Sequence, residues 1–505
     1  MMAGLSVLSV AASAQYRTDI PAETSSEPQQ VIEQAKTSET PVVITLEQAL
    51  EIALSENVSV KVADMEIERT GYAKKGAYAA LYPQIDASGA YQRTIKKQVM
   101  YMDIDMSSIM GGGAGAPGAG APGAGEGSGE GEGGGAMLPG GAGNDGESSG
   151  SAGGGGLEVG RWNTWSAGLS AAMPLVNAQL WQSIKLSGLD VELAVEKARS
   201  SRLDMVTQVK NAYYSILFAK EAFNVYKSVY ENAVSNYEET KKKYDAEKVP
   251  EMELVRAKTT VANAVPNVYN AESSVILALW QLKAVLGVDL DLNLDVAGQL
   301  SDYAQQMFYD IHQHDVATLD RNSVMKQLAI QAEMLAETIK LQKYANIPSL
   351  ALGFNFSMNA MTNDFNFSEY RWTPYSYVGV SLAIPIFAGG KRYNQIRQAK
   401  NQYQQVQLQT VNTERQLQIA IRQQLTTMEM NMKSYYAAQD AVAAAYKGYS
   451  IAEKAYQVGR STLIELNDAQ LALTQARLAE SQAIFNFVSA KAQLEQTLGQ
   501  DFISE

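Results

Sequence analysis

Two carboxylates near the C-terminal end offer the clearest spacing for chemistry in this sequence. Glu465 and Asp468 are three positions apart, and that spacing puts both side chains on one face of a helix. Such a pair can face a path for ions, or it can be an exposed acidic pair on a solvated helix. Carboxylates are abundant elsewhere, but no acid–base pair stands out as a catalytic site.

The remaining candidates for chemistry are weak. His312 and His314 are the only histidines and lie two apart in a polar linker, where nothing supplies the further ligands of a metal site. Gly389–Arg392 lacks the first glycine and the Ser or Thr of a phosphate-binding loop. The chain has no cysteine, which excludes disulfides and thiolate metal sites. We therefore expect no catalytic residue, no metal and no cofactor, and a protein that is not an enzyme.

Composition narrows the class of partner. The 505 residues carry a formal net charge of -13, which argues against nucleic acid because its phosphates need clustered Lys and Arg. No apolar run approaches the 18 or so residues of a transmembrane helix. If the chain spans a membrane, it must do so as a closed β-barrel.

Three segments are expected to lie outside the main fold. Residues 1–14 resemble a signal peptide, with an apolar run that ends in the cleavage pattern Ala12-Ser13-Ala14. Residues 15–41 are polar and read as a flexible leader. Residues 110–156 are glycine-rich and of low complexity, which indicates a solvent-exposed loop.

The segment 377–392 shows how a strand with one apolar face leads directly into a long helix. Its first half alternates apolar and polar residues, the pattern of a strand with one apolar face; the apolar positions are Val378, Val380, Leu382 and Ile384. Pro385 ends this strand, and Gly389-Gly390 permits a change of direction. A helix of good helix formers without proline then runs from Tyr393 to Val458.

Similar patterns recur along the chain. Strands are expected near 85–91, 164–173 and 350–358, the second of them ending at Pro174. A helix capped by Thr45 should run to about Ala80. The other helices are expected over 177–243, from the turn at Pro250 to Leu286, up to Pro348, and from a turn near Gly459 to Leu498.

The order of elements is an internal repeat. Met173-Pro174-Leu175 precedes Ile384-Pro385-Ile386 by 211 positions, Tyr244 precedes Tyr456 by 212, and Pro83 precedes Pro348 by 265. The glycine-rich insert accounts for the difference of about 54. We therefore divide the chain into a first repeat, 42–298, which includes the insert 110–156, and a second repeat, 299–505.

Four strands of about 10 residues with one apolar face have the length of membrane-spanning β-strands. About eight strands are the practical minimum for closure, and lipid does not tolerate open edges. Several copies must then share one barrel, with eight strands from two copies or twelve from three. A soluble coiled-coil scaffold without a pore, in the periplasm or at the surface, is the alternative, although it would not contain four amphipathic strands.

Two stretches carry a resemblance to a known family: Ile384–Gly390 at the strand-to-helix passage, and Tyr456–Leu466 at the helical turn. With the repeat, they make residues 42–500 similar to the TolC family of outer-membrane efflux ducts. The resemblance implies an α+β membrane protein in which two membrane strands plus a long helical hairpin are duplicated. It also implies a homotrimer, a 12-strand β-barrel in the lipid of the bacterial outer membrane, and an α-helical barrel across the periplasm. The role is passive, since a periplasmic adaptor and an inner-membrane pump of the RND, ABC or MFS type supply small molecules and energy.

The resemblance also assigns residues. Glu465 and Asp468 would form the pore constriction, where six carboxylates from three copies repel anions, attract cations and raise one another's pKa. Glu253 and Tyr456 would form the latch that holds the aperture shut. The adaptor-docking tips would be Val458, Gly459, Ser461 and Thr462, with Lys248 and Val249 in the first repeat, whose turn lacks a glycine. Gly459 suits a tight turn, or equally a helix C-cap.

Overall fold

The structure is a computed structural model. It describes Ile32, Ala35 and residues 41–100, 157–308, 319–366 and 369–500. The expected signal peptide 1–14, the insert 110–156, the two histidines and nearly all of the expected leader 15–41 lie outside the described residues. The described chain divides into two compact units.

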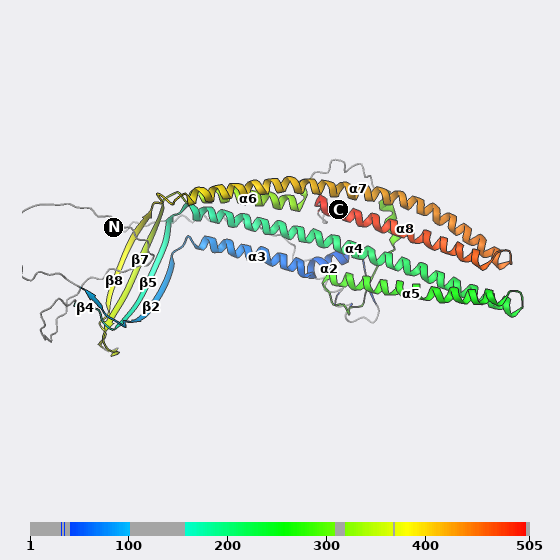
Figure 1. Cartoon of the computed structure of the whole chain (residues 1–505), viewed down its shortest axis with the longest axis horizontal. Helices are drawn as coiled ribbons and strands as arrows, with labels where there is room; N and C mark the ends of the chain where they lie inside the picture. The colour runs from blue at the N-terminus through cyan, green and yellow to red at the C-terminus, as the bar shows by residue number, and fades with distance from the viewer. Residues whose placement is uncertain are drawn as a thin grey trace, which may run out of the picture. The chain divides into compact units, whose positions relative to one another are not determined.

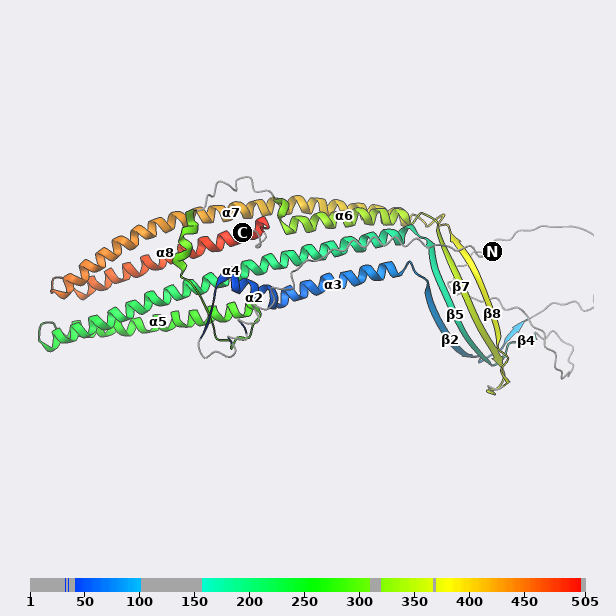
Figure 2. The ribbon, with the colours of Figure 1, turned by 180° about the vertical axis from the view of Figure 1, so that it is seen from behind.

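The smaller unit comprises Pro83–Leu175 and Leu350–Leu382 and holds a four-stranded sheet. Its strands are β2 (Gln84–Arg93), β5 (Asn163–Val176), β7 (Ser349–Thr362) and β8 (Thr373–Ala383), in the order β2-β5-β7-β8 (Figure 1). A short antiparallel pair, β3 (Gln98–Met100) with β4 (Leu157–Val159), belongs to the same unit. The four expected strands are therefore confirmed and lie side by side (Figure 2).

The pairing of β2 with β5 aligns their apolar positions on one face of the sheet. The strands are antiparallel, and Ile85 lies opposite Ala171 while Tyr91 lies opposite Trp165. The Tyr91 and Trp165 rings are 4.4 Å apart between centroids. Pro174 does not end β5 as expected, because the strand continues to Val176, beyond the last residue that pairs with β2.

The larger unit holds the helices. The first hairpin joins α4 (Ala178–Asp245) to α5 (Glu251–Leu286), and the second joins α7 (Lys391–Gln457) to α8 (Leu463–Leu498). The shorter helices α3 (Val58–Ala79) and α6 (Ser323–Tyr344) pack beside these hairpins. Helix α4 packs against α3, α5, α6 and α8, and α7 packs against α6 and α8 (Figure 1).

The helix expected from Thr45 to about Ala80 is instead two helices. Thr45 caps α2 (Leu46–Glu56) through a capping box with Gln48, as expected. Asn57 then breaks the helix, with a ψ of 131°, and its side chain caps α3 by accepting from Ser59 N. Its Nδ2 also donates to the carbonyl oxygen of Val285, 2.7 Å away near the end of α5. Asn57 thus joins the end of one helix to the start of another.

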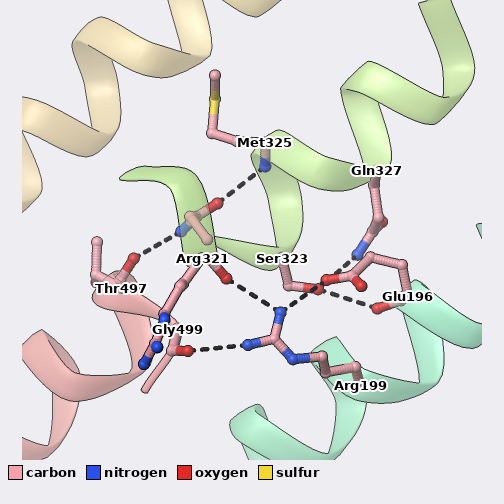
Figure 3. Close-up of polar contacts among 9 residues, drawn as sticks. Glu196, Arg199, Arg321, Ser323, Met325, Gln327, Thr497 and Gly499 are labelled. Carbon is pink, nitrogen blue, oxygen red and sulfur yellow. Dashed lines mark hydrogen bonds and ion pairs between the residues drawn. The ribbon is translucent and has the colours of Figure 1, made fainter. Parts of the chain in front are cut away.

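The second repeat has the equivalent joint between α8 and α6. Asn322 caps α6 and donates through Nδ2 to the carbonyl of Thr497 at 2.7 Å. The Arg199 guanidinium of α4 donates to the carbonyls of Arg321 (3.1 Å) and Gly499 (2.9 Å), as Figure 3 shows. Ser323 donates to the carbonyl of Glu196 at 3.0 Å. This joint therefore holds α4, α6 and α8 together.

The helical unit also contains short elements that the sequence patterns did not indicate. Strand β1 (Val42–Ile44) pairs in parallel with β6 (Leu294–Val296), followed by the 3-10 helices η2 (Leu300–Phe308) and η4 (Leu319–Arg321). Tyr213 of α4 donates to the carbonyl of Ala297 at 2.7 Å. Ala35, inside the expected leader, is buried against this core.

The helices of the described residues differ from membrane-spanning helices. None of them combines the length and the apolar character that a bilayer crossing requires.

Candidate functional site

The turn between α7 and α8 is built around a left-handed glycine. Gly459 has a φ of +76°. Its N–H donates to the carbonyl of Tyr456 at 3.1 Å, and Arg460 N donates to the carbonyl of Ala455 at 2.7 Å. These bonds satisfy the last carbonyls of α7. Gly459 thus follows the Val458 cap of α7 as the left-handed residue that ends the helix, and it is part of a tight turn at the same time.

The turn between α4 and α5 has the same conformation without a glycine. Glu247, 212 positions before Gly459, has a φ of +54° and is the only described non-glycine residue with positive φ. Lys248 N donates to the carbonyl of Lys243 at 2.8 Å, which repeats the Arg460 bond. Glu247 therefore bears a backbone strain of about 1–2 kcal/mol that glycine avoids. The repeat arithmetic could have identified Glu247, because it occupies the glycine's place.

Both turns are open to solvent. Val458 is 70% exposed, and a Cβ added to Gly459 would meet no atom within 4 Å. The other expected docking residues are exposed (Thr462 and Lys248) or partly buried (Ser461 and Val249). The expected docking residues thus form two accessible tips, each at the end of a helical hairpin.

The two expected constriction residues differ in their surroundings. Glu465 closes a capping box with Thr462 at the start of α8, and its carboxylate accepts from the Ser461 hydroxyl and from Thr462 N. The Ser461 hydrogen bond, and after it the Thr462 bond, lower the pKa of Glu465. Asp468 lies one turn later and is exposed. The described chain therefore holds Glu465 ionised at a helix N-terminus, where a negative charge is favourable.

Tyr456 does not meet Glu253, its expected latch partner. Its hydroxyl instead lies 2.6 Å from Thr240 Oγ1 on α4. Lys243 Nζ donates to the Tyr456 carbonyl at 3.0 Å and sits 4.4 Å from the centroid of its ring. The Glu253 backbone N–H donates to the carbonyl of Pro250 in the turn. The contact between the hairpins near the tips therefore runs from α7 to α4, and the sequence patterns missed Thr240 and Lys243.

A small apolar cluster supports this contact. Tyr456 is 5% exposed and packs with Leu463 and Leu466 of α8 and Ala257 of α5. Further along, Asn232 of α4 donates to Gln470 of α8 at 3.3 Å, and Asn467 donates to Thr260 at 3.2 Å. Hydrogen bonds between neutral side chains thus add to the Lys243–Tyr456 contact between the two hairpins near the tips.

Charged contacts link the repeats farther from the tips. Glu337 of α6 is 4% exposed and accepts from Gln182 (2.5 Å), Lys185 (2.7 Å) and Lys340 (2.8 Å). The hydrogen bonds from Lys185 and Lys340 lower the pKa of Glu337 to about 2. Lys210 of α4 pairs with Glu495 of α8 at 2.6 Å. Nowhere in the described parts of the chain do three His, Asp or Glu side chains gather as a metal site.

Comparison with known proteins assigns the architecture. The family model described as outer membrane efflux protein matches residues 140–288 and 316–500. The chain belongs to the outer membrane efflux protein family. It is therefore an outer-membrane efflux channel, and proteins of this family are passive channels rather than enzymes.

Individual relatives share low sequence identity and high coverage. The outer membrane protein TolC of Vibrio cholerae is 20% identical over 342 residues, 66% of this chain and 76% of TolC. The Campylobacter jejuni CmeC outer membrane channel superposes with a TM-score of 0.63 at 16% identity, covering 92% of this chain and 89% of CmeC. For VceC, also from Vibrio cholerae, the TM-score is 0.64 at 15% identity, covering 90% of this chain and 96% of VceC. The efflux-channel fold expected from the sequence is thus confirmed.

Proposed function

We propose that this outer-membrane efflux protein works as a homotrimer in a tripartite export system. An inner-membrane pump of the RND, ABC or MFS type would deliver drugs, toxins or metabolites through a periplasmic adaptor. The chain itself would be the passive last segment, with three four-stranded sheets sharing one twelve-strand barrel in the lipid of the outer membrane.

The sheet carries this proposal. Its outermost strands in the described structure are β2 and β8. The apolar face of β8 is open as well, with Val378, Val380 and Leu382 between 59% and 69% exposed. An amphipathic sheet with two open edges and an uncovered apolar face is unstable alone in water or in lipid. Pairing its edges with other copies and facing its apolar side toward lipid satisfies both requirements.

The hairpin tips support adaptor docking and a gate. Val458 and Lys248 are exposed at the two turns, so an adaptor can approach them. Glu465 and Asp468 lie just past the second turn on α8. The lowered pKa of Glu465 keeps its charge at neutral pH, which fits a mouth that attracts cations. Tyr456 with Thr240 would hold α7 on α4 while the mouth is shut.

The decisive experiment compares aspartate on the two faces of β8. Val380→Asp puts a charge on the apolar face, and Ser381→Asp puts the same charge on the other face. An aspartate on the lipid side is destabilising, although by less than the roughly 2–4 kcal/mol that Arg or Lys costs at mid-bilayer. We expect V380D to abolish detergent-resistant trimers and single-channel currents in planar bilayers. S381D should leave trimers intact and change only conductance or selectivity.

Two results would contradict the proposal. Equal tolerance of both aspartates would mean that neither face of β8 meets lipid. Release of the wild-type protein as a monomer or dimer by buffer without detergent, with no bilayer currents, would favour the non-channel coiled-coil scaffold instead.

A further inference from the structure

Helices α3 and α6 occupy equivalent places in the two repeats but have different neighbours. Among the described elements, α6 packs against two long helices, α4 and α7, whereas α3 packs against one long helix, α4. Buried Val60 and the Arg202–Asp64 ion pair (2.6 Å) mark the face of α3 that meets α4. Positions 58, 65 and 72 lie about 120–160° around the helix from Val60, on the side without a long neighbour.

That open face carries an apolar stripe. Val58, Met65 and Tyr72 are spaced by seven and are 67%, 68% and 60% exposed. Adding the repeat offset of 265 gives Ser323, Ile330 and Glu337 of α6. Ser323 Oγ donates to the backbone carbonyl of Glu196 on α4, and the Glu337 carboxylate pairs with Lys185 of α4. The stripe on α3 therefore occupies the positions that α6 uses to bind α4.

A matching surface lies on α7. Adding the repeat offset of 212 to Glu196 and Lys185 of α4 gives the equivalent positions on α7, Leu408 and Arg397. Leu408 is 72% exposed. Arg397 lines an open hollow on α7 with Asn394, Gln398, Asn401, Gln402 and Gln405. Asn394 is the equivalent of Gln182, another residue that binds Glu337. The hollow thus lies where α4 receives the carboxylate of α6.

The chemistry of the two surfaces is complementary. Tyr72 stands where α6 has Glu337, and both attract a cation from the next turn: Lys340 Nζ is 2.8 Å from Glu337, and Lys75 Nζ is 5.2 Å from the centroid of the Tyr72 ring. An aromatic face binds a guanidinium such as that of Arg397. Val58 and Leu408 are the exposed apolar residues at the positions that Ser323 and Glu196 have in the contact of α6 with α4.

We propose that the stripe on α3 of one copy packs on α7 of the next copy in the register that α6 has on α4. Val58 then meets the next copy's Leu408, and Tyr72 enters the hollow beside its Arg397. The contact is head-to-tail, so that repetition closes a ring. This assignment rests on the proposed homotrimer and specifies which residues meet between its copies.

Cysteine pairs test the register directly, because the chain contains no cysteine. We expect Val58→Cys with Leu408→Cys, and Tyr72→Cys with Arg397→Cys, to give linked dimers and trimers on a non-reducing gel after oxidation. Ser323→Cys with Glu196→Cys is the control within one chain and should lose its thiols without a change in mass. Val58→Cys with Arg397→Cys is the off-register control, displaced by about 20 Å along α3, far beyond the reach of a disulfide.

The outcomes separate this inference from the proposed function. Two results would overturn the assigned contact without affecting the proposed trimeric channel. In one, a trimer forms but links only through the off-register pair. In the other, neither in-register pair links although the control within one chain reacts. A particle that is monomeric by light scattering and links nowhere overturns both. Linking in both in-register pairs, with none in the off-register pair, supports the assignment.

Discussion

The hydrogen bond between Tyr456 and Thr240 has a definite direction. Thr240 Oγ1 lies 2.7 Å from the carbonyl oxygen of Asn236, to which it donates its single proton. The Tyr456 hydroxyl, 2.6 Å away, is then the donor to Thr240. Because both residues are buried, this bond exchanges little with water and resists separation of α7 from α4.

Tyr456→Phe should loosen this contact without disturbing the turn. The substitution removes the donor and leaves Thr240 bonded to Asn236, so the expected cost is about 1 kcal/mol. If the mouth opens by parting α7 from α4, the ratio of open to closed channels rises by about fivefold. Single-channel recording measures this ratio. Tyr446→Phe, on the same helix and 58% exposed, should leave it unchanged; equal effects of the two substitutions would argue against a latch at Tyr456.

Glu337 gives the α4–α6 contact a defined dependence on pH. Its pKa is about 2 in the folded protein against an ordinary value of 4.5. A lowered folded pKa stabilises the fold above the unfolded value, and this contribution is lost as the pH falls from about 4.5 toward 2. Glu337→Gln should therefore lower the melting temperature at pH 7, and the gap from wild type should shrink below about pH 4.5. Exposed Glu333→Gln is the control, and a gap independent of pH would contradict the assignment.

The sequence was a better guide to where a residue lies in the fold than to which other residue it contacts. The resemblance to the efflux-duct family places Gly459 at the turn and Tyr456 at the hairpin contact, and both residues lie there. The partner of Tyr456 could not be deduced, since Thr240 lies 216 positions away on α4 and helix packing alone brings it there. The resemblance places Glu465 in a pore constriction, and its spacing from Thr462 also fits the capping box that the structure contains.

At the scale of elements, the two helix joints follow one design. Each has an Asn cap whose side-chain amide reaches the carbonyl two residues before a left-handed glycine: Asn57 with Gly287, and Asn322 with Gly499. A Cβ on Gly287 would lie 2.9 Å from the Glu56 carbonyl oxygen, and one on Gly499 would overlap the carbonyl of Arg321. Both glycines therefore permit a positive φ and a close approach of two backbones.

Gly499→Ala and Gly459→Ala form a matched test of that close approach. Both positions have positive φ, +67° and +76°, so alanine costs about 1–2 kcal/mol at each. Only Gly499 has a neighbour in the way, and displacing Arg321 adds about 1–3 kcal/mol. Thermal or urea unfolding in detergent should rank G499A well below G459A. Equal losses would mean that the joint relaxes freely.

Long elements were predictable, and short ones were not. The four strands and both hairpins follow from alternation, helix formers and proline positions that are local in sequence. The parallel pair of β1 with β6 joins Val42 to Leu294, and three-residue strands contain too few positions for a period to be recognised. The break at Asn57 was hidden because good helix-forming patterns flank it on both sides.

At the scale of the whole molecule, one packing geometry is used with two chemistries. The contact of α6 with α4 inside the chain is ionic, through Glu337 of α6 with Lys185 of α4. The equivalent contact proposed between copies replaces the carboxylate of Glu337 with Tyr72 and has Leu408 at the position of Glu196. An apolar and aromatic interface of this kind associates with little dependence on salt, whereas exposed ion pairs weaken as salt rises.

Exchanging these chemistries yields a prediction about assembly. Tyr72→Glu recreates Glu337 at the interface between copies, opposite the next copy's Arg397, so assembly should persist but acquire a dependence on salt. An exposed pair is worth about 0.2–1 kcal/mol, and a ring of three copies contains three. Adding Arg397→Glu opposes like charges and should weaken assembly, whereas Tyr72→Lys with Arg397→Glu should restore it. Analytical ultracentrifugation in detergent across salt concentrations measures the trimer fraction. Tyr78→Glu is the control, since its equivalent Lys343 is exposed on α6; the same salt dependence in that variant would show that the effect does not arise at Tyr72.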